Sequence, residues 1–318
     1  MKRAKYGLIV VTPVYEDTEA ATRLFRELAA EFAREVFVVA VDDGSVRQPL
    51  DVSTISEAGL SGVVIKLKRN VGHQRAIAIG INYAAEHLPD NTVVVMDSDG
   101  EDLPGTIKSL MQPLADPDVD VVVAHRKSRV ETWRFRAFYL AYKWFFKLLS
   151  GRKISFGNFM ALKPAAVKRL AAMQELWIHV AGCVLISKLR MVACPLDRGP
   201  RYAGHSKMNF VGLALHGFKG LMVFAEDVLV RVGIACALVA VLSVIASVVA
   251  IVLKLMGFAT PGWFSVALGI LLLVFLQTGT LTLMTLMLTG VVRGGMIANL
   301  AYTEFVDSYA HTHSDQTI

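Results

Sequence analysis

Four carboxylates follow an apolar run of the chain within six residues. The run is Val93–Met96, and Asp97, Asp99, Glu101 and Asp102 come directly after it. Such a run is typical of a buried parallel strand, and open α/β folds bind ligands beyond the carboxyl ends of their strands. Crowded carboxylates repel one another unless a hard cation lies between them, and Mg²⁺ or Mn²⁺ carrying a nucleotide phosphate suits that setting. The stretch predicts a metal site, with a solvated acidic turn as the alternative.

Polar residues also follow two earlier apolar runs. The first run is Gly7–Thr12, after which a proline at position 13 predicts an extended turn through Asp17. The second run is Val36–Val41, which ends in Asp42 and Asp43. Carboxylates at the edge of a sheet can accept hydrogen bonds from a ribose or a base. These positions therefore predict a nucleotide-binding edge.

Two basic turns lie farther along the chain. Residues 68–75 open a helix expected over Ala76–Ala85, and helix amino ends with nearby cations suit phosphates. Residues 125–131 form a basic loop after an expected strand over Val119–Ala124. A solvated turn is the alternative for this loop.

Strand-like and helix-like segments alternate through this part of the chain. The alternation predicts an α/β fold with a mostly parallel sheet. Neither a Gly-x-Gly-x-x-Gly nor a Gly-x-x-x-x-Gly-Lys-Ser/Thr motif follows any expected strand. The pattern therefore argues against a dinucleotide-binding dehydrogenase and against a P-loop nucleotidase.

Two uncharged runs near the end of the chain predict a membrane hairpin. Val232–Leu253 has 22 residues without a charge and Phe264–Thr289 has 26, and each is long enough to span a bilayer as a helix. We expect spans over about 230–254 and 264–290. A buried hairpin of a soluble protein is the alternative, but it would have to be enclosed on every side.

Charge predicts the orientation of this hairpin. Arg231 and Arg293 flank its outer ends, so the positive-inside rule predicts both termini and the larger domain in the cytoplasm at the plasma (inner) membrane. Lys254, in the connecting loop, mildly opposes this. The net charge of +6 is explained by an anionic membrane surface and phosphate ligands, without nucleic acid as a partner.

Segments beside the hairpin have the character of surface helices. In residues 132–149, Arg136, Lys143 and Lys147 share one side of a helical wheel, and aromatic residues lie opposite, which suits a membrane interface. A core helix of the soluble domain is the alternative. Residues 207–226 predict a second surface helix. The expected division is a domain over 1–228, the hairpin over 229–292 and a tail over 293–318.

A stripe of threonines recurs in the second expected span. Its members are Thr278, Thr282, Thr285 and Thr289. Their spacing puts four hydroxyl groups on one helix face, and such stripes pack helices or protomers together. The stripe predicts homo-oligomerisation.

Four motifs together resemble a known family. They are Thr-Pro-Val-Tyr-Glu-Asp at 12–17, Asp-Asp-Gly-Ser at 42–45, Met-Asp-Ser-Asp at 96–99 and Arg-x-x-Gly-x-Ser-Lys at 201–207. In this order the chain resembles inverting glycosyltransferases of family 2, with a GT-A fold. It is most similar to the polyprenyl-phosphate sugar transferases, the dolichol-phosphate mannose synthase-like branch. The resemblance implies metal-dependent transfer of a sugar from a nucleotide sugar donor to a polyprenyl phosphate acceptor at the cytoplasmic membrane face.

The resemblance also implies roles for individual residues. Those expected to hold the nucleoside are Pro13, Tyr15, Asp17, Asp42 and Asp43. Those expected on the metal and diphosphate are Asp97 and Asp99, with Glu101 or Asp102 as a further ligand because the family often has Gln at position 101. Those expected to bind phosphates are Arg126, Arg129, Arg201, Ser206 and Lys207. A plain basic loop near a membrane is the alternative for residues 201–207.

One position departs from the family. Relatives carry Asp, the favoured catalytic base, where this chain has Asn158. Three explanations stay open for an active enzyme: an acceptor phosphate that needs no base, a base supplied by Asp102, Glu175 or His179, or another lipid or glycan as acceptor. A catalytically silent membrane scaffold is the remaining alternative, against which the retained pair Asp97 and Asp99 argues.

Overall fold

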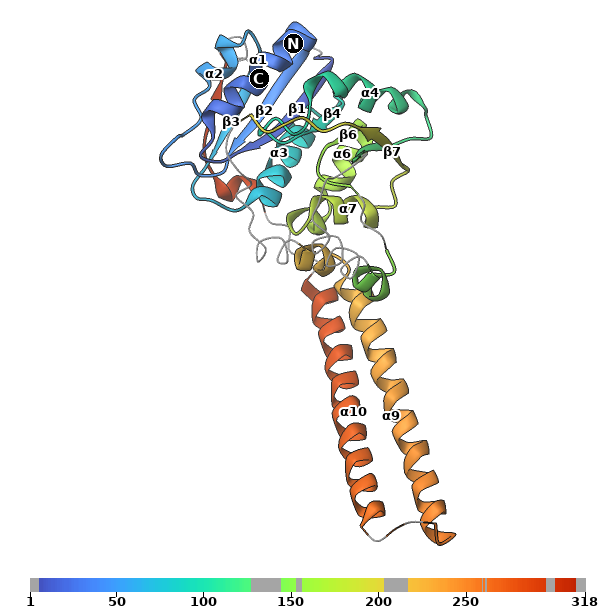
Figure 1. The fold of residues 1–318 in the computed structure, drawn as a ribbon. Coiled ribbons are helices and arrows are strands. Elements are labelled where there is room, and N and C mark those ends of the chain that lie inside the picture. The colour runs from blue at the N-terminus through green and yellow to red at the C-terminus, as the bar shows by residue number, and fades with distance from the viewer. Residues whose placement is uncertain are drawn as a thin grey trace. The chain divides into compact units, whose positions relative to one another are not determined.

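The computed structural model describes residues 6–126, 144–152, 156–202, 217–258, 260, 262–295 and 301–312. These residues form two compact units (Figure 1). The first unit holds the described residues up to 126, those from 156 to 223, and 301–312. The second unit holds residues 144–152 and the described residues from 224 to 295.

An eight-stranded sheet organises the first unit. Its strands are β1 (Leu8–Val14), β2 (Val36–Asp42), β3 (Ser61–Leu67), β4 (Val93–Val95), β5 (Val121–Arg126), β6 (Met160–Leu162), β7 (Met191–Leu196) and β8 (Val306–His311). Their order across the sheet is β7-β5-β6-β4-β1-β2-β3-β8. β6 and β8 run antiparallel to their neighbours, and the other neighbouring pairs are parallel. The predicted α/β class with a mostly parallel sheet is confirmed.

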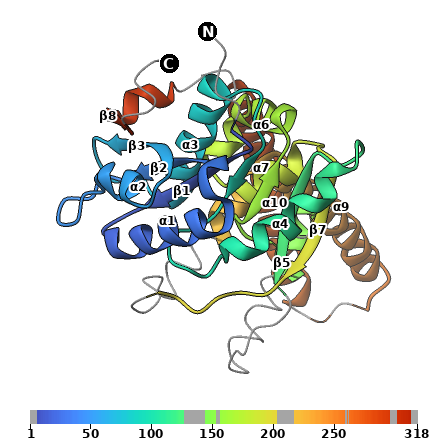
Figure 2. The ribbon, with the colours of Figure 1, turned by 90° about the horizontal axis from the view of Figure 1, so that it is seen from above.

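Helices cover both faces of this sheet, which is why its central strands are apolar on both sides. The helices on one face are α1 (Thr18–Phe32), α2 (Ser53–Glu57) and α4 (Ile107–Met111). Those on the other face are α3 (His73–His87), α6 (Pro164–Ala171) and α7 (Val180–Ile186) (Figure 2). Every residue of β1 and β2 is buried. The core therefore has two layers, separated by the sheet.

Pro13 lies inside β1, although the sequence predicted that this proline would begin a turn. A proline is excluded from a central strand wherever its missing N–H would join a ladder. The carbonyl of Val11 accepts from the N–H of Met96, so Val11 and, two residues later, Pro13 direct their backbone groups toward β4. β4 ends at Val95, opposite Val11, so no ladder remains on that side at Pro13.

The chain returns to the first unit after its two long helices. β8 pairs with β3, and Gly62 and Thr312 exchange two hydrogen bonds, from Gly62 N to Thr312 Oγ1 at 3.1 Å and from Thr312 N to Gly62 O at 3.0 Å. Residues 293–318 were expected to form a tail, so β8 is a strand that the sequence did not predict. Segments before and after the two long helices therefore share one sheet.

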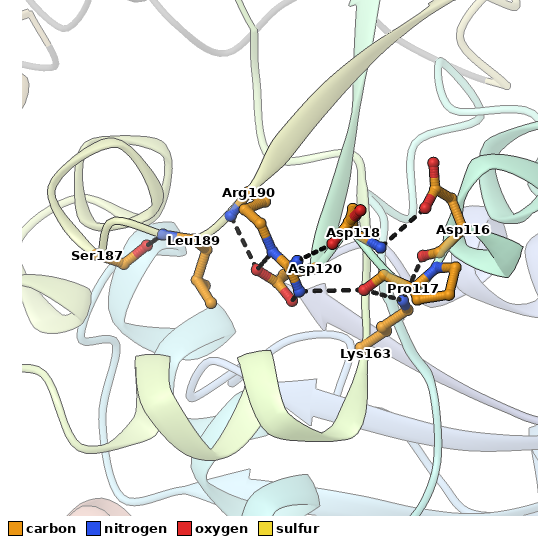
Figure 3. A network of polar contacts seen from close by, with 8 residues as sticks. All are labelled: Asp116, Pro117, Asp118, Asp120, Lys163, Ser187, Leu189 and Arg190. Atoms are coloured by element: carbon orange, nitrogen blue, oxygen red, sulfur yellow. Dashed lines mark hydrogen bonds and ion pairs between the residues drawn. The ribbon is translucent and has the colours of Figure 1, made fainter.

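A network of charged groups joins the amino ends of β5 and β7 (Figure 3). Arg190 donates from Nε to Asp120 Oδ2 at 3.0 Å, from Nη2 to Asp120 Oδ1 at 3.0 Å and from Nη2 to the carbonyl of Pro117 at 3.0 Å. Its Nη1 pairs with Asp118. The hydrogen bonds from Arg190 lower the pKa of Asp120 to about 2. The network holds the two strands in register where they begin.

The second unit is built on two long helices, α9 (Ala225–Leu255) and α10 (Trp263–Gly295), which pack against each other. Both are long and apolar enough to cross a membrane, and they contain the two predicted spans. Leu273 and Met287 are 67% and 76% exposed, and an apolar surface of this extent indicates membrane association.

One member of the threonine stripe of α10, Thr285, packs against α9. Thr285 is buried, and a Cβ added to Gly233 of α9 would lie 2.8 Å from its Oγ1. The Thr285 hydroxyl donates to the carbonyl of Thr282 at 2.8 Å. Contact between α9 and α10 therefore accounts for Thr285, and homo-oligomerisation stays a prediction.

Candidate active site

The chain reverses its direction across the sheet between β1 and β4. β2 and β3 follow β1 on one side, whereas β4 lies on the other side. Open α/β sheets bind ligands beyond the carboxyl ends of their strands at such a switch point. Residues 15–17 follow β1 there, and the acidic turn, residues 97–102, follows β4. The Ser98 hydroxyl donates to the carbonyl of Pro13 at 3.0 Å, which joins the two loops.

The acidic turn is closed by its own carboxylates. Asp102 Oδ2 accepts from the N–H of Asp97 at 3.0 Å, and Asp99 Oδ1 accepts from the N–H of Glu101 at 3.1 Å. Gly100 has φ +88°, a conformation that favours glycine. Burial and, next, the charge of Asp97 raise the pKa of Asp99. The turn thus places Asp97 close enough to Asp99 to raise its pKa, and it gives Asp102 a structural role. That Asp97 and Asp99 bind a metal stays a prediction.

Asp42 and Asp43 are 2% and 3% exposed, and both accept hydrogen bonds from backbone N–H groups. Asp42 accepts from the N–H groups of Ser45 at 3.0 Å and Leu50 at 2.9 Å. Asp43 accepts from Val71 at 2.7 Å and from the next residue at 3.0 Å. They therefore fix the loop after β2 and the turn before α3. Direct contact of either carboxylate with a nucleoside stays a prediction.

The predicted residues after β1 fall into two roles. Tyr15 is 46% exposed, so its ring is accessible to a ligand. Asp17 caps α1, because its Oδ1 accepts from the N–H of Ala20 at 3.3 Å.

Asn158 is held by the first turn of α3. Its Oδ1 accepts from Gln74 Nε2 at 3.2 Å, and its Nδ2 lies 3.1 Å from His73 Nε2. The same His73 nitrogen lies 3.2 Å from Asp97 Oδ1. Burial opposes a charge on His73, but the nearby carboxylates, Asp97 first, outweigh it and raise the His73 pKa. His73 was not among the predicted site residues, although the basic turn 68–75 and the start of α3 marked its position.

The segment 198–202, called here the arginine segment, lies against the acidic turn. Gly199 donates its N–H to the carbonyl of Glu101 at 3.0 Å, and Tyr202 donates its N–H to the carbonyl of Asp99 at 2.9 Å. A Cβ added to Gly100 would lie 2.6 Å from the Tyr202 ring, so the ring packs directly on that glycine. Two backbone hydrogen bonds and one ring contact therefore dock the segment.

Side chains complete this contact. Arg201 Nε donates to Glu101 Oε1 at 3.0 Å, and Arg201 Nη2 lies 3.0 Å from Asp99 Oδ2. Arg198 Nη2 pairs with Glu101 Oε2. The predicted Arg201 thus joins the acidic turn, and Arg198, which was not predicted, joins it as well. In the sequence, Arg198 is distinguished only as a second arginine, three residues before Arg201.

Comparison with known proteins identifies the family. The model of Glycosyl transferase family 2 matches residues 9–175, just over half of the chain. The chain belongs to glycosyl transferase family 2. It is therefore a glycosyltransferase, and the suspected family is confirmed.

Curated relatives of this transferase cover different shares of it. The glycosyltransferase YkoT of Bacillus subtilis is 24% identical over 87% of this chain and 85% of its own length. An undecaprenyl-phosphate 4-deoxy-4-formamido-L-arabinose transferase of Edwardsiella ictaluri is 25% identical over 64% of this chain and 63% of its own length. A dodecaprenyl-phosphate galacturonate synthase of Rhizobium johnstonii is 28% identical over 38% of this chain and 36% of its own length.

A solved structure supports the fold of the transferase. Glucosyl-3-phosphoglycerate synthase from Mycobacterium tuberculosis, crystallised with Mn²⁺, UDP-glucose and phosphoglyceric acid, superposes with a TM-score of 0.51. It is 14% identical and covers 70% of this chain and 79% of that one. At this identity the likeness concerns the GT-A-like sheet alone.

Several predicted residues of the transferase lie outside the described residues: Arg129, Ser206 and Lys207, with 132–143 and 207–216 of the two expected surface helices. Arg126 is described by its backbone, as the last residue of β5. Among the alternative bases, His179 is buried and caps α7, with its Nδ1 accepting from the N–H of Gly182 at 3.0 Å. Glu175 lies in the 3₁₀ helix Gln174–Trp177.

Proposed function

We propose that this family 2 transferase moves a sugar from a nucleoside diphosphate sugar to the phosphate of a polyprenyl carrier, with inversion at the anomeric carbon. The observation that carries the proposal is that one chain joins carboxylates and arginines at the switch point of its sheet to a long apolar hairpin. The relatives named as acting on undecaprenyl phosphate and dodecaprenyl phosphate support the acceptor class. The product would be a lipid-linked sugar for glycan or cell-envelope synthesis.

Asp97 and Asp99 would hold Mg²⁺ or Mn²⁺, and this pair fits a hard cation. Both are carboxylates of one partly buried turn, and their mutual repulsion contributes to the raised pKa of Asp99. A divalent cation favours the ionised form of both. When bound, it neutralises charge on the departing diphosphate.

The chain's own cations would act on the same charge. Breaking the bond between sugar and diphosphate leaves negative charge on the nucleotide, and fixed guanidinium and ammonium groups stabilise that charge most where water is excluded. Arg201 already lies beside Asp99 at 3.0 Å. By family resemblance, Arg126, Arg129, Ser206 and Lys207 would join Arg201 around the phosphates, and Pro13, Tyr15, Asp17, Asp42 and Asp43 would surround the nucleoside.

Asn158 is compatible with a phosphate acceptor. An amide takes no proton at neutral pH, whereas a hydroxyl acceptor would need a base. A phosphomonoester has its second pKa at about 6, so it is already ionised near pH 7. Asn158, held by Gln74 and lying beside His73, would orient this nucleophile without deprotonating it.

The hairpin would deliver the lipid acceptor from the cytoplasmic side. Arg231 and Arg293 flank it, as expected of ends that stay in the cytoplasm. β8, which follows the hairpin, lies in the same sheet as the seven strands that precede it. This supports a hairpin with both of its ends on one side of the membrane. The described part of the first surface helix, residues 144–150, exposes Trp144 and Phe145 at 61% and 55%, as suits a membrane interface.

Incubating the purified full-length protein with a panel of nucleotide sugars, a short polyprenyl phosphate and Mg²⁺ or Mn²⁺ tests the proposal. We expect one donor to give a lipid-linked sugar of inverted anomeric configuration, detected by mass spectrometry and NMR. The Asp99→Ala variant is the matched inactive control. Donor hydrolysis without a lipid-linked sugar, or transfer to a lipid or glycan hydroxyl instead, would show the proposed acceptor to be wrong.

A further inference from the structure

The side chain of Gln74 joins two segments of the first unit. Gln74 is 7% exposed and lies in the first turn of α3. Its Oε1 accepts from the N–H of Val180 at 2.8 Å, and its Nε2 donates to Asn158 Oδ1 at 3.2 Å. One buried amide therefore links the start of α7 to the loop before β6.

The N–H of Val180 decides which way both amides point. A backbone N–H can only donate, so the oxygen of Gln74 must face α7 and its NH₂ group must face Asn158. An NH₂ group can also only donate, so the oxygen of Asn158 must in turn face Gln74. The amide nitrogen of Asn158 is therefore on the opposite side, where it lies beside His73.

The start of α7, which supplies this N–H, is itself held firmly. Val180 is fully buried, and the preceding residue, His179, caps α7 by accepting from the N–H of Gly182 at 3.0 Å. A Cβ added to Gly182 would lie 3.0 Å from the Val223 side chain, so this helix packs closely against the chain just before α9. Because the Val180 N–H is fixed, the Gln74 amide has one favourable orientation.

The nitrogen of Asn158 is available to a ligand. Asn158 and Asp97 both line a cavity of about 20 Å³, which has room for one water-sized group. His73 Nε2 lies 3.1 Å from Asn158 Nδ2 and 3.2 Å from Asp97 Oδ1. An ionised carboxylate only accepts, so a proton on Nε2 faces Asp97 and leaves no lone pair there for Asn158. The amide N–H groups of Asn158 thus suit an oxygen that a ligand brings.

This orientation favours one class of acceptor over another. An ionised phosphate oxygen carries negative charge and accepts strong hydrogen bonds from N–H groups. A hydroxyl acceptor must instead lose its proton to a base within hydrogen-bond reach. With its carbonyl turned toward Gln74, Asn158 presents to the site only atoms that donate.

We infer that Gln74 is a positioning residue that turns the amide N–H groups of Asn158 toward the acceptor, and that this pair selects an ionised phosphate over a hydroxyl. The inference rests on the proposed function, because it takes the acceptor to be a polyprenyl phosphate. Gln74 does not touch the acceptor in this arrangement and acts only through Asn158.

Two substitutions of Gln74 separate orientation from stability. Gln74→Glu keeps an oxygen for Val180 but loses the NH₂ group, so Asn158 turns its nitrogen toward Glu and its carbonyl toward the acceptor. Gln74→Met loses both hydrogen bonds and leaves the Asn158 amide able to turn either way. At about pH 8, where the new carboxylate is ionised, we expect the acceptor KM to rise about tenfold or more in Gln74→Glu and a few fold in Gln74→Met.

The thermal midpoints should fall in the opposite order. The first turn of α3 favours the negative charge of Gln74→Glu, whereas Gln74→Met leaves the buried N–H of Val180 without an acceptor. We therefore expect Gln74→Met to be the less stable variant and the less impaired one. A rise in acceptor KM that simply follows the loss of thermal midpoint would overturn the inference.

Steady-state kinetics of the full-length protein measure these effects. The donor is the one identified by the nucleotide sugar panel, and the acceptor is the short polyprenyl phosphate. Donor KM should stay within about twofold in both variants. Asn91→Asp is the matched control, because it makes the same exchange of amide for carboxylate in a side chain that donates to the carbonyl of Tyr6 at 2.6 Å, before β4 begins. It should change neither KM.

A competing alcohol tests the selection between acceptor classes. The polyprenol of the same length is added as an inhibitor of transfer to the polyprenyl phosphate. It should inhibit Gln74→Glu at least as well as the wild type, because the carbonyl of a turned Asn158 accepts from a hydroxyl. Equal weakening of alcohol and phosphate would show a general loss of the site and overturn the inference.

A double-variant cycle tests whether Gln74 acts through Asn158. In Asn158→Ala the amide is absent, so adding Gln74→Met should raise the acceptor KM no further. An equal effect of Gln74→Met in both backgrounds would contradict the inference. If Gln74→Glu does not fold, this cycle decides the question alone.

Failure of the inference and failure of the proposed function give different results. A wild-type protein that makes no lipid-linked sugar from the polyprenyl phosphate with any donor would contradict the proposed function. A wild type that uses this acceptor, together with an unchanged acceptor KM in folded Gln74→Glu, would contradict the role of Gln74 alone.

Discussion

Two clusters of arginines and carboxylates lie at opposite edges of the same sheet, and they differ in how completely their hydrogen bonds are made. At the amino ends of β5 and β7, Arg190 uses Nε, Nη1 and Nη2 on Asp118, Asp120 and a carbonyl. At the carboxyl edge, Arg198 leaves its buried Nε without an acceptor among the described residues.

The pKa shifts of the two clusters run in opposite directions. Hydrogen bonds from Arg190 lower the pKa of Asp120, whereas burial and Asp97 raise the pKa of Asp99 despite Arg201. Burial also lowers the pKa of Arg198. Ionised Asp120 therefore stabilises the fold, and ionised Asp99 opposes it.

The difference shows which edge of the sheet carries electrostatically unfavourable groups. The amino edge needs only to hold two strands in register, so its charges are paired and partly solvated. The carboxyl edge carries groups whose charges are incompletely matched, as expected of a site that awaits a cation and an anion. Variants in the two clusters should therefore separate activity from stability.

Asp99→Asn should have the largest effect, on activity alone. Removing this carboxylate takes away a proposed metal ligand, and we expect sugar transfer to fall about a hundredfold or more. Because the raised pKa shows that ionised Asp99 is unfavourable in the fold, the thermal midpoint should not fall. Transfer rates and differential scanning fluorimetry measure the two effects. A large loss of stability would contradict the distinction between the clusters.

Gly100→Ala should reduce activity about tenfold or more by displacing the arginine segment. The added Cβ would lie 2.6 Å from the Tyr202 ring, and the φ of +88° adds strain of about 1–3 kcal/mol. Gly59→Ala is the matched control, since φ there is +80° but nothing lies within 4 Å. It should lose stability and keep donor KM. Equal effects on KM in both variants would show that backbone strain, and not Tyr202, is the cause.

Asp120→Asn should lower stability and leave activity unchanged. The pKa of about 2 lies below the usual value, so the stabilising contribution is present above about pH 4 and is lost as the pH falls toward 2. At pH 7 we expect the free energy of unfolding to fall by about 1 kcal/mol, after allowing for exposure of the pair. Wild type and variant should converge in thermal midpoint near pH 2. A constant difference across this range would contradict the role of the charge.

Tyr202→Phe should have the smallest effect, a rise in donor KM of a few fold. The variant keeps the ring on Gly100 and loses the hydrogen bond to Glu27, which contributes about 1 kcal/mol. Tyr302→Phe is the matched control, because its hydroxyl donates to Glu86 Oε2 at 2.8 Å, away from the acidic turn. Steady-state kinetics should show a changed KM for Tyr202→Phe alone. An equal change in both would mean that KM follows general stability.

Local patterns predicted β1, β2, β4 and β5, because a strand covered by helices on both faces is apolar along its whole length. β1, β2, β3, β4 and β5 all lie on apolar runs. β8 was missed since its sequence, Val-Asp-Ser-Tyr-Ala-His, is mostly polar and it lies at an edge with exposed positions. Pro13 was assigned to a turn because the early end of β4 is not visible in the residues around that proline.

The residues of the candidate site also fall into those that local sequence predicts and those that it does not. The acidic turn is local, so its carboxylates could be found from spacing. Arg198 pairs with Glu101, which lies almost a hundred residues earlier in the chain. His73, in α3, contacts Asn158, which lies in the loop before β6. Residue types do not predict such long-range partners, since any exposed arginine or histidine has the same local signature.

By itself the sequence determined the α/β class, the position of the acidic turn and the two apolar spans, because each depends on the chemistry of neighbouring residues. Only the tertiary structure decided which oxygen faces which cation, that Thr285 of α10 packs against α9, and that β8 joins the edge of the sheet beside β3. Those outcomes depend on which distant segments the fold brings together, and side-chain direction and burial exist only after that packing is complete.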